Sequence, residues 1–153
     1  MELDIREIPS ADRKQYMDLL LIGDEQPEMI AKYLDKGWMF ALFVGGKIVS
    51  SSIVIQLYEK AFEIKNIATY PDEQNKGYGT TLLKYIIEYF VPAAEVIYVG
   101  TGNNRKTLDF YEHCGFEYSH TVKNFFIDNY DHPIIEEGKQ LIDMIYLKKV
   151  RKS

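Results

Sequence analysis

A polar glycine loop, from Gln74 to Thr80, contains the residues of this chain best suited to bind a ligand. It follows a stretch of strand character and precedes an apolar stripe of helical period, so the first N–H groups of that helix lack partners within it. Those N–H groups and the helix dipole attract anions, and Gly77 and Gly79 let a phosphate approach the backbone closely. Lys76 adds a positive charge. The loop predicts a phosphate site, or else a tight strand-to-helix turn that needs glycine for steric reasons alone.

Two common phosphate-binding motifs do not match this loop. A Walker A loop requires Gly-Lys followed by Ser or Thr, whereas Lys76 precedes the glycines here. A dinucleotide-binding fingerprint requires a third glycine where Leu82 stands. Neither motif therefore explains the loop.

The rest of the chain predicts a single mixed α/β domain over residues 1–153. We expect strands over residues 2–7, 38–44, 47–58, 62–70, 95–101, 116–127 and 141–148. Two helices are expected between Pro9 and Gly37, the second with Asp24 as its N-cap, a long one from Gly79 to Pro92, and another over 104–114. The order βααβββαβαββ mixes hairpins with crossovers, so antiparallel pairs are expected early and parallel pairing in the middle.

One hairpin within this order is predicted by a specific signal. Gly45-Gly46 separates two apolar runs, and both central residues of the favoured two-residue turns require positive φ. In the strand that follows, alternate residues are expected to share one face. These residues are Val49, Ser51, Ile53, Ile55 and Leu57.

The composition excludes several classes of protein. The 46% hydrophobic and 14% aromatic content is too high for disorder, and the apolar run from Trp38 to Val44 is too short to cross a bilayer. A net charge of −5 argues against nucleic-acid binding by phosphate neutralisation. Cys114 has no second cysteine with which to pair, and the residues after Met1 lack the pattern of a secretory signal. We therefore expect a cytoplasmic protein that binds neither nucleic acid nor membrane.

Three segments, taken in order, resemble the GCN5-related N-acetyltransferase (GNAT) family. Residues 66–69 stand on the expected strand, and the loop from Gln74 to Gly79 fits the family pattern Gln/Arg-x-x-Gly-x-Gly/Ala. Asn104 and the segment from Phe110 to Phe116 resemble the family's asparagine and its Phe-Tyr-x-x-x-Gly-Phe sequence. The resemblance is strongest over residues 62–116, and the later residues are similar to a branch of small bacterial members.

The resemblance implies an acyl-CoA N-acyltransferase fold with an acetyl-CoA site where the two central parallel strands splay apart. The pantetheine arm would pair with the strand edge, and the diphosphate would rest on the N–H groups of the loop. The cofactor residues so implied are Ile67, Ala68, Thr69, Gln74, Asn75, Lys76, Gly77, Tyr78, Gly79, Thr80, Asn104, Phe110 and Tyr111. For Asn104 an N-cap role is the alternative, and the two roles are compatible.

The implied reaction is direct attack of a primary amine on the acetyl thioester in a ternary complex. Tyr111 matches the family tyrosine that protonates the departing thiolate, although helical period alone makes it a core aromatic. Glu63 matches by position the carboxylate used as general base, acting through water. The alternative for Glu63 is a pair with Lys65, and Glu59 is a poorer second candidate. A lysine-like amine of pKa about 10.4 is neutral at pH 7 in only about one molecule in 2,500, so the need for a base depends on the substrate.

The acceptor is expected to be a small-molecule or peptide amine. Phe125, Phe126 and Tyr130 are candidates for the wall of its pocket, or else core aromatics. The three histidines show no paired ligand spacing, so no metal is expected. A homodimer is compatible with the sequence. Two rival functions are a non-catalytic acyl-CoA sensor and a nucleotide-phosphate binder.

Overall fold

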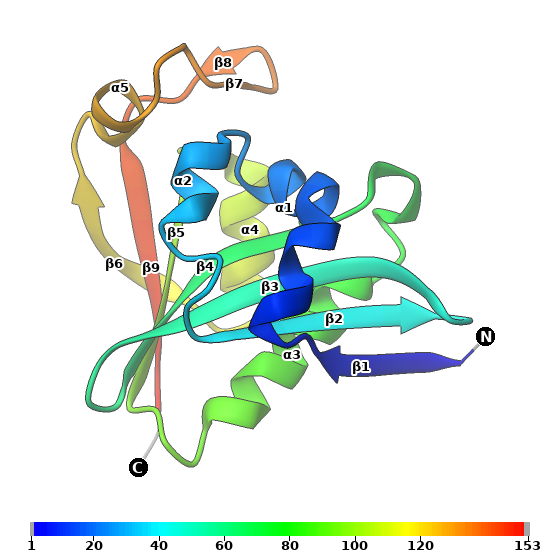
Figure 1. The fold of residues 1–153 in the computed structure, drawn as a ribbon. Helices are drawn as coiled ribbons and strands as arrows, with labels where there is room; N and C mark the ends of the chain where they lie inside the picture. The colour runs from blue at the N-terminus through cyan, green and yellow to red at the C-terminus, as the bar shows by residue number, and fades with distance from the viewer. Residues whose placement is uncertain (1, 152–153) are drawn as a thin grey trace.

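The sheet at the centre of this protein has seven strands and carries helices on both faces (Figure 1). The computed structural model describes residues 2–151. The strands are β1 (Leu3–Glu7), β2 (Trp38–Val44), β3 (Lys47–Tyr58), β4 (Ala61–Thr69), β5 (Val96–Thr101), β6 (Glu117–Val122) and β9 (Met144–Val150), with β7 (Ile135–Glu136) and β8 (Lys139–Gln140) in a separate hairpin. The helices are α1 (Met17–Gly23), α2 (Pro27–Ala31), α3 (Tyr78–Phe90), α4 (Arg105–His113) and α5 (Phe125–Asn129), with 3₁₀ turns η1 (Ser10–Tyr16) and η2 (Pro71–Glu73).

The strand order is β1-β2-β3-β4-β5-β9-β6, and β4 and β5 pair in parallel while the other neighbours pair antiparallel. The predicted mixed sheet is therefore confirmed. The β4–β5 register ends at Ile64 opposite Val99, so the last residues of β4 continue without a partner on that side. A bulge at Lys65, where the β3–β4 register shifts, lies at the point where the two strands part. This splay creates the space for a site.

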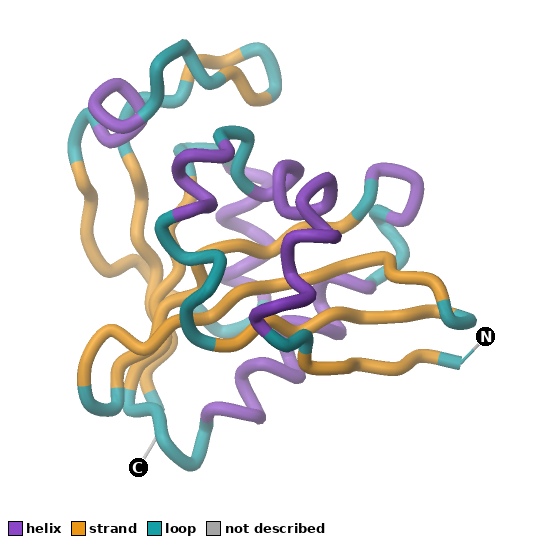
Figure 2. The backbone as a smooth tube through the Cα atoms, viewed as in Figure 1, coloured by secondary structure: helices purple, strands orange, loops and turns teal. Residues whose placement is uncertain are grey.

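Helices lie on both faces of the sheet (Figure 2), and each face carries an apolar core. Behind the sheet, α3 buries Leu82, Leu83, Ile86 and Phe90 of the predicted apolar stripe against residues of the strands, while Ile87, the fifth residue of the stripe, is partly buried. In front, α1 and α2 bury Leu20 and Ile30 against Met39 and Ile53. Each helix is held by one apolar face, so the ends of α3 and α1 that point toward the splay are free to form a site.

The Gly45-Gly46 turn has positive φ at both residues, as the hairpin signal predicts, but the alternation expected in β3 is wrong at its first residue. Leu42 pairs with Ser50 and Phe43 with Ile48, which leaves Val49 as the extra residue of a bulge. Val49 therefore packs with Leu42 and Val44, on the opposite face from Ile53. A bulge inserts one extra residue, so the side chains on its two sides no longer follow one alternation between the faces of the sheet. The residue pattern does not indicate where such a bulge lies.

The expected strand over residues 116–127 is also wrong in its second half. Strand β6 ends at Val122, and Asn124 then adopts a left-handed φ of 58° before α5 begins at Phe125. The Asn124 N–H donates to Asp143 Oδ1 at 2.8 Å, which holds the turn in place. The chain then forms the β7–β8 hairpin. Residues 123–143, between β6 and β9, therefore form a folded segment at one end of the sheet (Figure 1). We call it the closing segment.

Candidate active site

A cleft of about 570 Å³ opens where β4 leaves β5. It brings together every cofactor residue that the resemblance implies except Lys76, which instead pairs with Glu73 at 3.3 Å. Five further residues that belong to no motif also line the cleft: Glu73, Lys106, Thr107, Glu136 and Glu137. The end of β4 and the glycine loop that follows it therefore share one concave surface with α4, which comes later in the chain.

The N-terminus of α3 forms one wall of this cleft. Gly77 is its N-cap with φ 84°, and the first bond of the helix runs from the Thr81 N–H to the Gly77 carbonyl at 3.0 Å. The N–H groups of Tyr78, Gly79 and Thr80 precede that bond, and no side chain caps them. A Cβ at Gly77 would meet no described atom within 4 Å, so the backbone here faces open space. This cradle fits an anionic group such as a diphosphate.

The end of β4 forms the opposite wall. Residues Ile67 to Thr69 pair with β3 on one side and have no β5 partner on the other. The hydroxyl groups of Ser50 and Thr69 share a hydrogen bond, with 2.9 Å between Ser50 Oγ and Thr69 Oγ1. Gln74 Nε2 donates to the Thr69 carbonyl at 3.0 Å. The strand edge is thus held rigidly against the loop, and its outward backbone groups fit an extended amide-bearing arm.

Asn104 has the N-cap role that the sequence left open. Its Oδ1 accepts from the Lys106 N–H at 3.0 Å, and its Nδ2 donates to Glu136 Oε1 at 3.1 Å. The second bond ties α4 to the closing segment beside the cleft. Glu136 was missed by sequence reasoning, because it lies 32 residues away in a segment that no motif describes.

Tyr111 lies between this cleft and a second cavity of about 280 Å³, and it is among the lining residues of both. The residue is 4% exposed, and its ring packs edge-on against Phe110 and Phe116. Burial raises the pKa of the Tyr111 phenol, and the nearby Cys114 and Glu136 raise it further. The phenol therefore stays protonated at neutral pH and can act as a donor.

The second cavity is formed by the end of α1, the strand residues at the splay and the closing segment. Phe126 and Tyr130 line it, whereas Phe125 lines an adjoining cavity of about 70 Å³. Asp24, Glu25 and Glu136 also line the larger cavity. Asp24 is not the predicted N-cap, since α2 begins at Pro27 after Gln26.

Glu63 does not line either cavity that Tyr111 lines. Its side chain faces the 70 Å³ cavity and a further one of about 350 Å³ on the same face of the sheet. The residue is 7% exposed, and Lys65 Nζ lies 3.4 Å from Glu63 Oε2, which is the pairing that the sequence offered as the alternative. Burial raises the pKa of Tyr146, and the neighbouring Glu63 carboxylate raises it further through its charge and a hydrogen bond.

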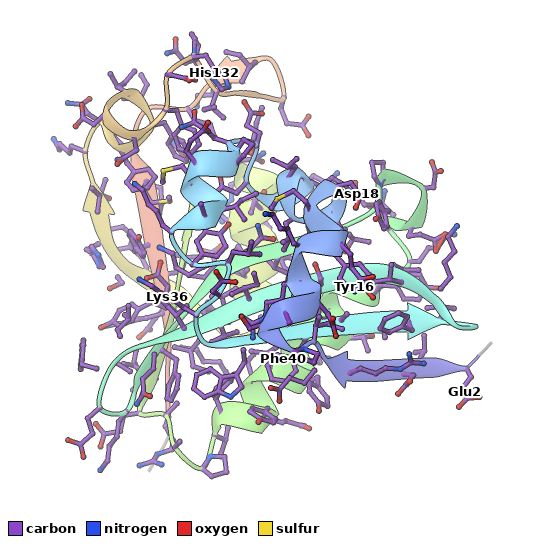
Figure 3. The ribbon with its side chains drawn as sticks, in the orientation of Figure 1. Glu2, Tyr16, Asp18, Lys36, Phe40 and His132 are labelled. Atoms are coloured by element: carbon purple, nitrogen blue, oxygen red, sulfur yellow. The ribbon has the colours of Figure 1, made fainter. Side chains whose placement is uncertain are left out.

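The closing segment is fastened to the turn between α1 and α2. The Tyr130 hydroxyl donates to Asp24 Oδ1 at 2.8 Å, and His132 Nε2 lies 3.0 Å from Glu25 Oε1. Figure 3 shows His132 at the outer end of the molecule, above α2. Hydrogen bonds to Asp131 and Glu25 raise the pKa of His132, so its imidazolium persists to higher pH than usual and its attraction to Glu25 fades as pH rises through that pKa. Asp131 and Glu25 thus favour the charged form of His132, whose partner Glu25 lines the cavity.

Within residues 2–151, no group of three His, Cys, Asp or Glu side chains is placed to hold a metal ion. Over the same range no helix has the length and apolar character needed to span a membrane.

A glycine cradle at a helix start, beside a strand that leaves its parallel neighbour, joins a second cavity at a buried tyrosine. Residues 4–116 match the model of the acetyltransferase (GNAT) family. The chain belongs to this family and is an N-acetyltransferase. The predicted family, fold and enzyme class are confirmed.

Individual relatives agree with this assignment over nearly the whole chain. "Uncharacterized N-acetyltransferase YvbK" of Bacillus subtilis (strain 168) is 31% identical over 143 residues, which are 92% of each chain. A Bacillus subtilis acetyltransferase solved in complex with CoA has a TM-score of 0.91 and 29% identity, covering 99% of this chain and 100% of its own. A GNAT acetyltransferase from Elizabethkingia anophelis with acetyl-CoA bound has a TM-score of 0.89 and 32% identity, covering 97% and 98%.

Proposed function

We propose that this protein transfers the acetyl group of acetyl-CoA to a primary amine, which attacks the thioester directly while both substrates are bound. One observation carries the proposal: Tyr111 lies where a cleft with an anion cradle meets a cavity that carries carboxylates. The family and the two ligand-bound relatives support the acetyl-CoA half of the reaction. Acetyl-CoA supplies the activated acetyl group, and the residues of the chain supply position and proton transfer.

Binding of the cofactor is assigned to residues that line the larger cleft. The free N–H groups of Tyr78, Gly79 and Thr80 hold the diphosphate, with support from the loop residues Gln74, Asn75 and Gly77. The open edge from Ile67 to Thr69 holds the pantetheine arm. Phe110 and Asn104 complete the wall on the α4 side, and Lys76 contributes charge from outside the cleft.

Tyr111 donates a proton to the departing sulfur. The raised pKa of the phenol keeps this proton in place until the sulfur departs. Glu63 accepts the proton of the attacking amine through intervening water, because it lines a small cavity that adjoins the one that receives the amine. Phe126 and Tyr130 form the wall of that cavity and Phe125 that of its smaller neighbour.

Replacing Glu63 with Gln tests the base. At pH 7 we expect kcat to fall by about tenfold or more for an alkyl amine, since positioned bases contribute about 10²- to 10⁴-fold and water replaces part of that here. The loss shrinks as pH rises toward the amine pKa of about 10.4, because more of the substrate is then already neutral. Profiles of kcat against pH for parent and variant measure this. A constant ratio of the two rates across pH 7 to 10 would remove Glu63 from proton transfer.

The proposed function itself is tested by binding and turnover together. Isothermal titration calorimetry with acetyl-CoA should show saturable binding, and release of CoA thiol should follow addition of an amine panel of alkyl amines, amino sugars, aminoglycosides and peptides. Binding without turnover of any amine would favour the acyl-CoA sensor. A larger thermal shift with ATP or GTP than with CoA would favour the nucleotide binder.

A further inference from the structure

One carboxylate in the acceptor cavity is oriented by hydrogen bonds from two tyrosines. Asp24 Oδ1 accepts from the Tyr130 hydroxyl at 2.8 Å, and Asp24 Oδ2 accepts from the Tyr33 hydroxyl at 3.2 Å. Asn66 Nδ2 in turn donates to the Tyr33 oxygen at 3.0 Å, so the proton of Tyr33 is directed toward Asp24. Burial raises the pKa of both phenols, and Asp24 raises them further, which keeps both as donors. The Asp24 carboxylate is therefore held in one position.

Asp24 has no cationic partner within residues 2–151. Lys65 is the lysine that lines the same cavity, and it pairs with Glu63 at 3.4 Å. Glu25 and Glu136 add further negative charge to the lining. A partly buried carboxylate among other acids is stabilised most by a cation that arrives with the ligand.

The side chain that supports Tyr33 is itself buried. Asn66 is 3% exposed, and its Nδ2 donates to the Leu20 carbonyl as well as to the Tyr33 oxygen. Its Oδ1 lies against Gly23, where an added Cβ would come within 2.5 Å of it, so the orientation of the amide behind Tyr33 is fixed by packing.

Apolar side chains line the same cavity as Tyr111 and Asp24. Ile67 and Tyr111 are shared with the cofactor cleft, and Ile64, Val99 and Leu141 line the acceptor cavity but not the cofactor cleft. A polymethylene chain would contact these side chains without burying polar groups against them. The cavity thus combines a reacting end, an aliphatic lining and an anionic group.

We propose that the acceptor is a linear aliphatic diamine, whose reacting amine lies beside Tyr111 and whose second, protonated amine pairs with Asp24. This assignment rests on the proposed acetyl transfer to an amine and specifies the class of acceptor. The reacting nitrogen must lose its proton to attack, whereas the second nitrogen, with pKa near 10, stays charged at the same pH and is recognised as a cation.

The test compares kcat/KM for matched acceptors at pH 8, using 1,4-diaminobutane against n-butylamine and 1,5-diaminopentane against n-pentylamine. The parent protein should prefer each diamine by about 10- to 100-fold, the range typical of a hydrogen-bonded ion pair. In D24N this ratio should fall to about threefold or less. Y130F, which removes one donor but leaves the carboxylate, should lie in between.

Asp128→Asn provides the matched control, because Asp128 is an exposed acid of α5 that lines no described cavity. It should keep the parent ratio, and a ratio that falls equally in D128N and D24N would overturn the role of Asp24. Comparable kcat/KM for monoamine and diamine in the parent would overturn the diamine acceptor and leave acetyl transfer intact. Absence of CoA release with every amine would overturn both.

Discussion

Replacing Tyr111 with Phe should lower kcat by about 100-fold or more and change the Kd for acetyl-CoA by less than about threefold. A positioned acid contributes about 10²- to 10⁴-fold, and the variant removes only the hydroxyl of a residue that lines both cavities. The ring that packs on Phe110 and Phe116 is retained, so the fold should persist. Steady-state kinetics and calorimetry measure the two quantities.

Tyr85→Phe is the matched control for this substitution. Tyr85 lies on α3, is 37% exposed and lines neither cavity that Tyr111 lines. Its kcat should equal that of the parent. Equal turnover by the Tyr111 variant and the parent would assign Tyr111 to the core alone, which is the reading that its helical spacing first suggested.

Gly77→Ala should weaken acetyl-CoA binding by about tenfold or more, because a methyl group would then stand in the cradle and the positive φ would be strained. Gly46→Ala is a close control. Both glycines have φ 84°, and at both positions an added Cβ meets no described atom within 4 Å. The two variants should therefore lose similar stability, about 1 kcal/mol each.

Only the Gly77 variant should lose affinity, since Gly46 lies in the β2–β3 turn and outside the described cavities. Thermal melts and calorimetry with acetyl-CoA separate stability from binding. Equal affinity in the two variants would mean that Gly77 serves the turn alone, and the diphosphate would have to be held elsewhere.

Much of the candidate site was predictable because its residues lie in short contiguous segments. The glycine loop and the segment from Asn104 to Phe116 each carry their own turn, cap and apolar face, so local residue types predict both the structure and the family. All the implied cofactor residues but one line a single cleft for this reason. Lys76 is the exception, because its long side chain reaches Glu73 within the loop.

The residues that sequence reasoning missed depend on contacts between distant segments. Tyr130 reaches Asp24 across 106 residues, and Asn104 reaches Glu136 across 32. These pairs form because β9 lies in the sheet between β5 and β6. This position of β9 places the closing segment, which precedes it in the chain, near the splay. No periodicity encodes such an insertion.

By itself, the amino-acid sequence determined the order of the main elements, the apolar faces and the glycine turn at the start of α3, since each depends on neighbours within a few residues. Only the tertiary structure decided where β4 parts from β5, which face Val49 packs on, and which residues enclose the second cavity beside Tyr111. Bulges and long-range hydrogen bonds form when separate segments meet, so their energies belong to pairs of segments and not to either one.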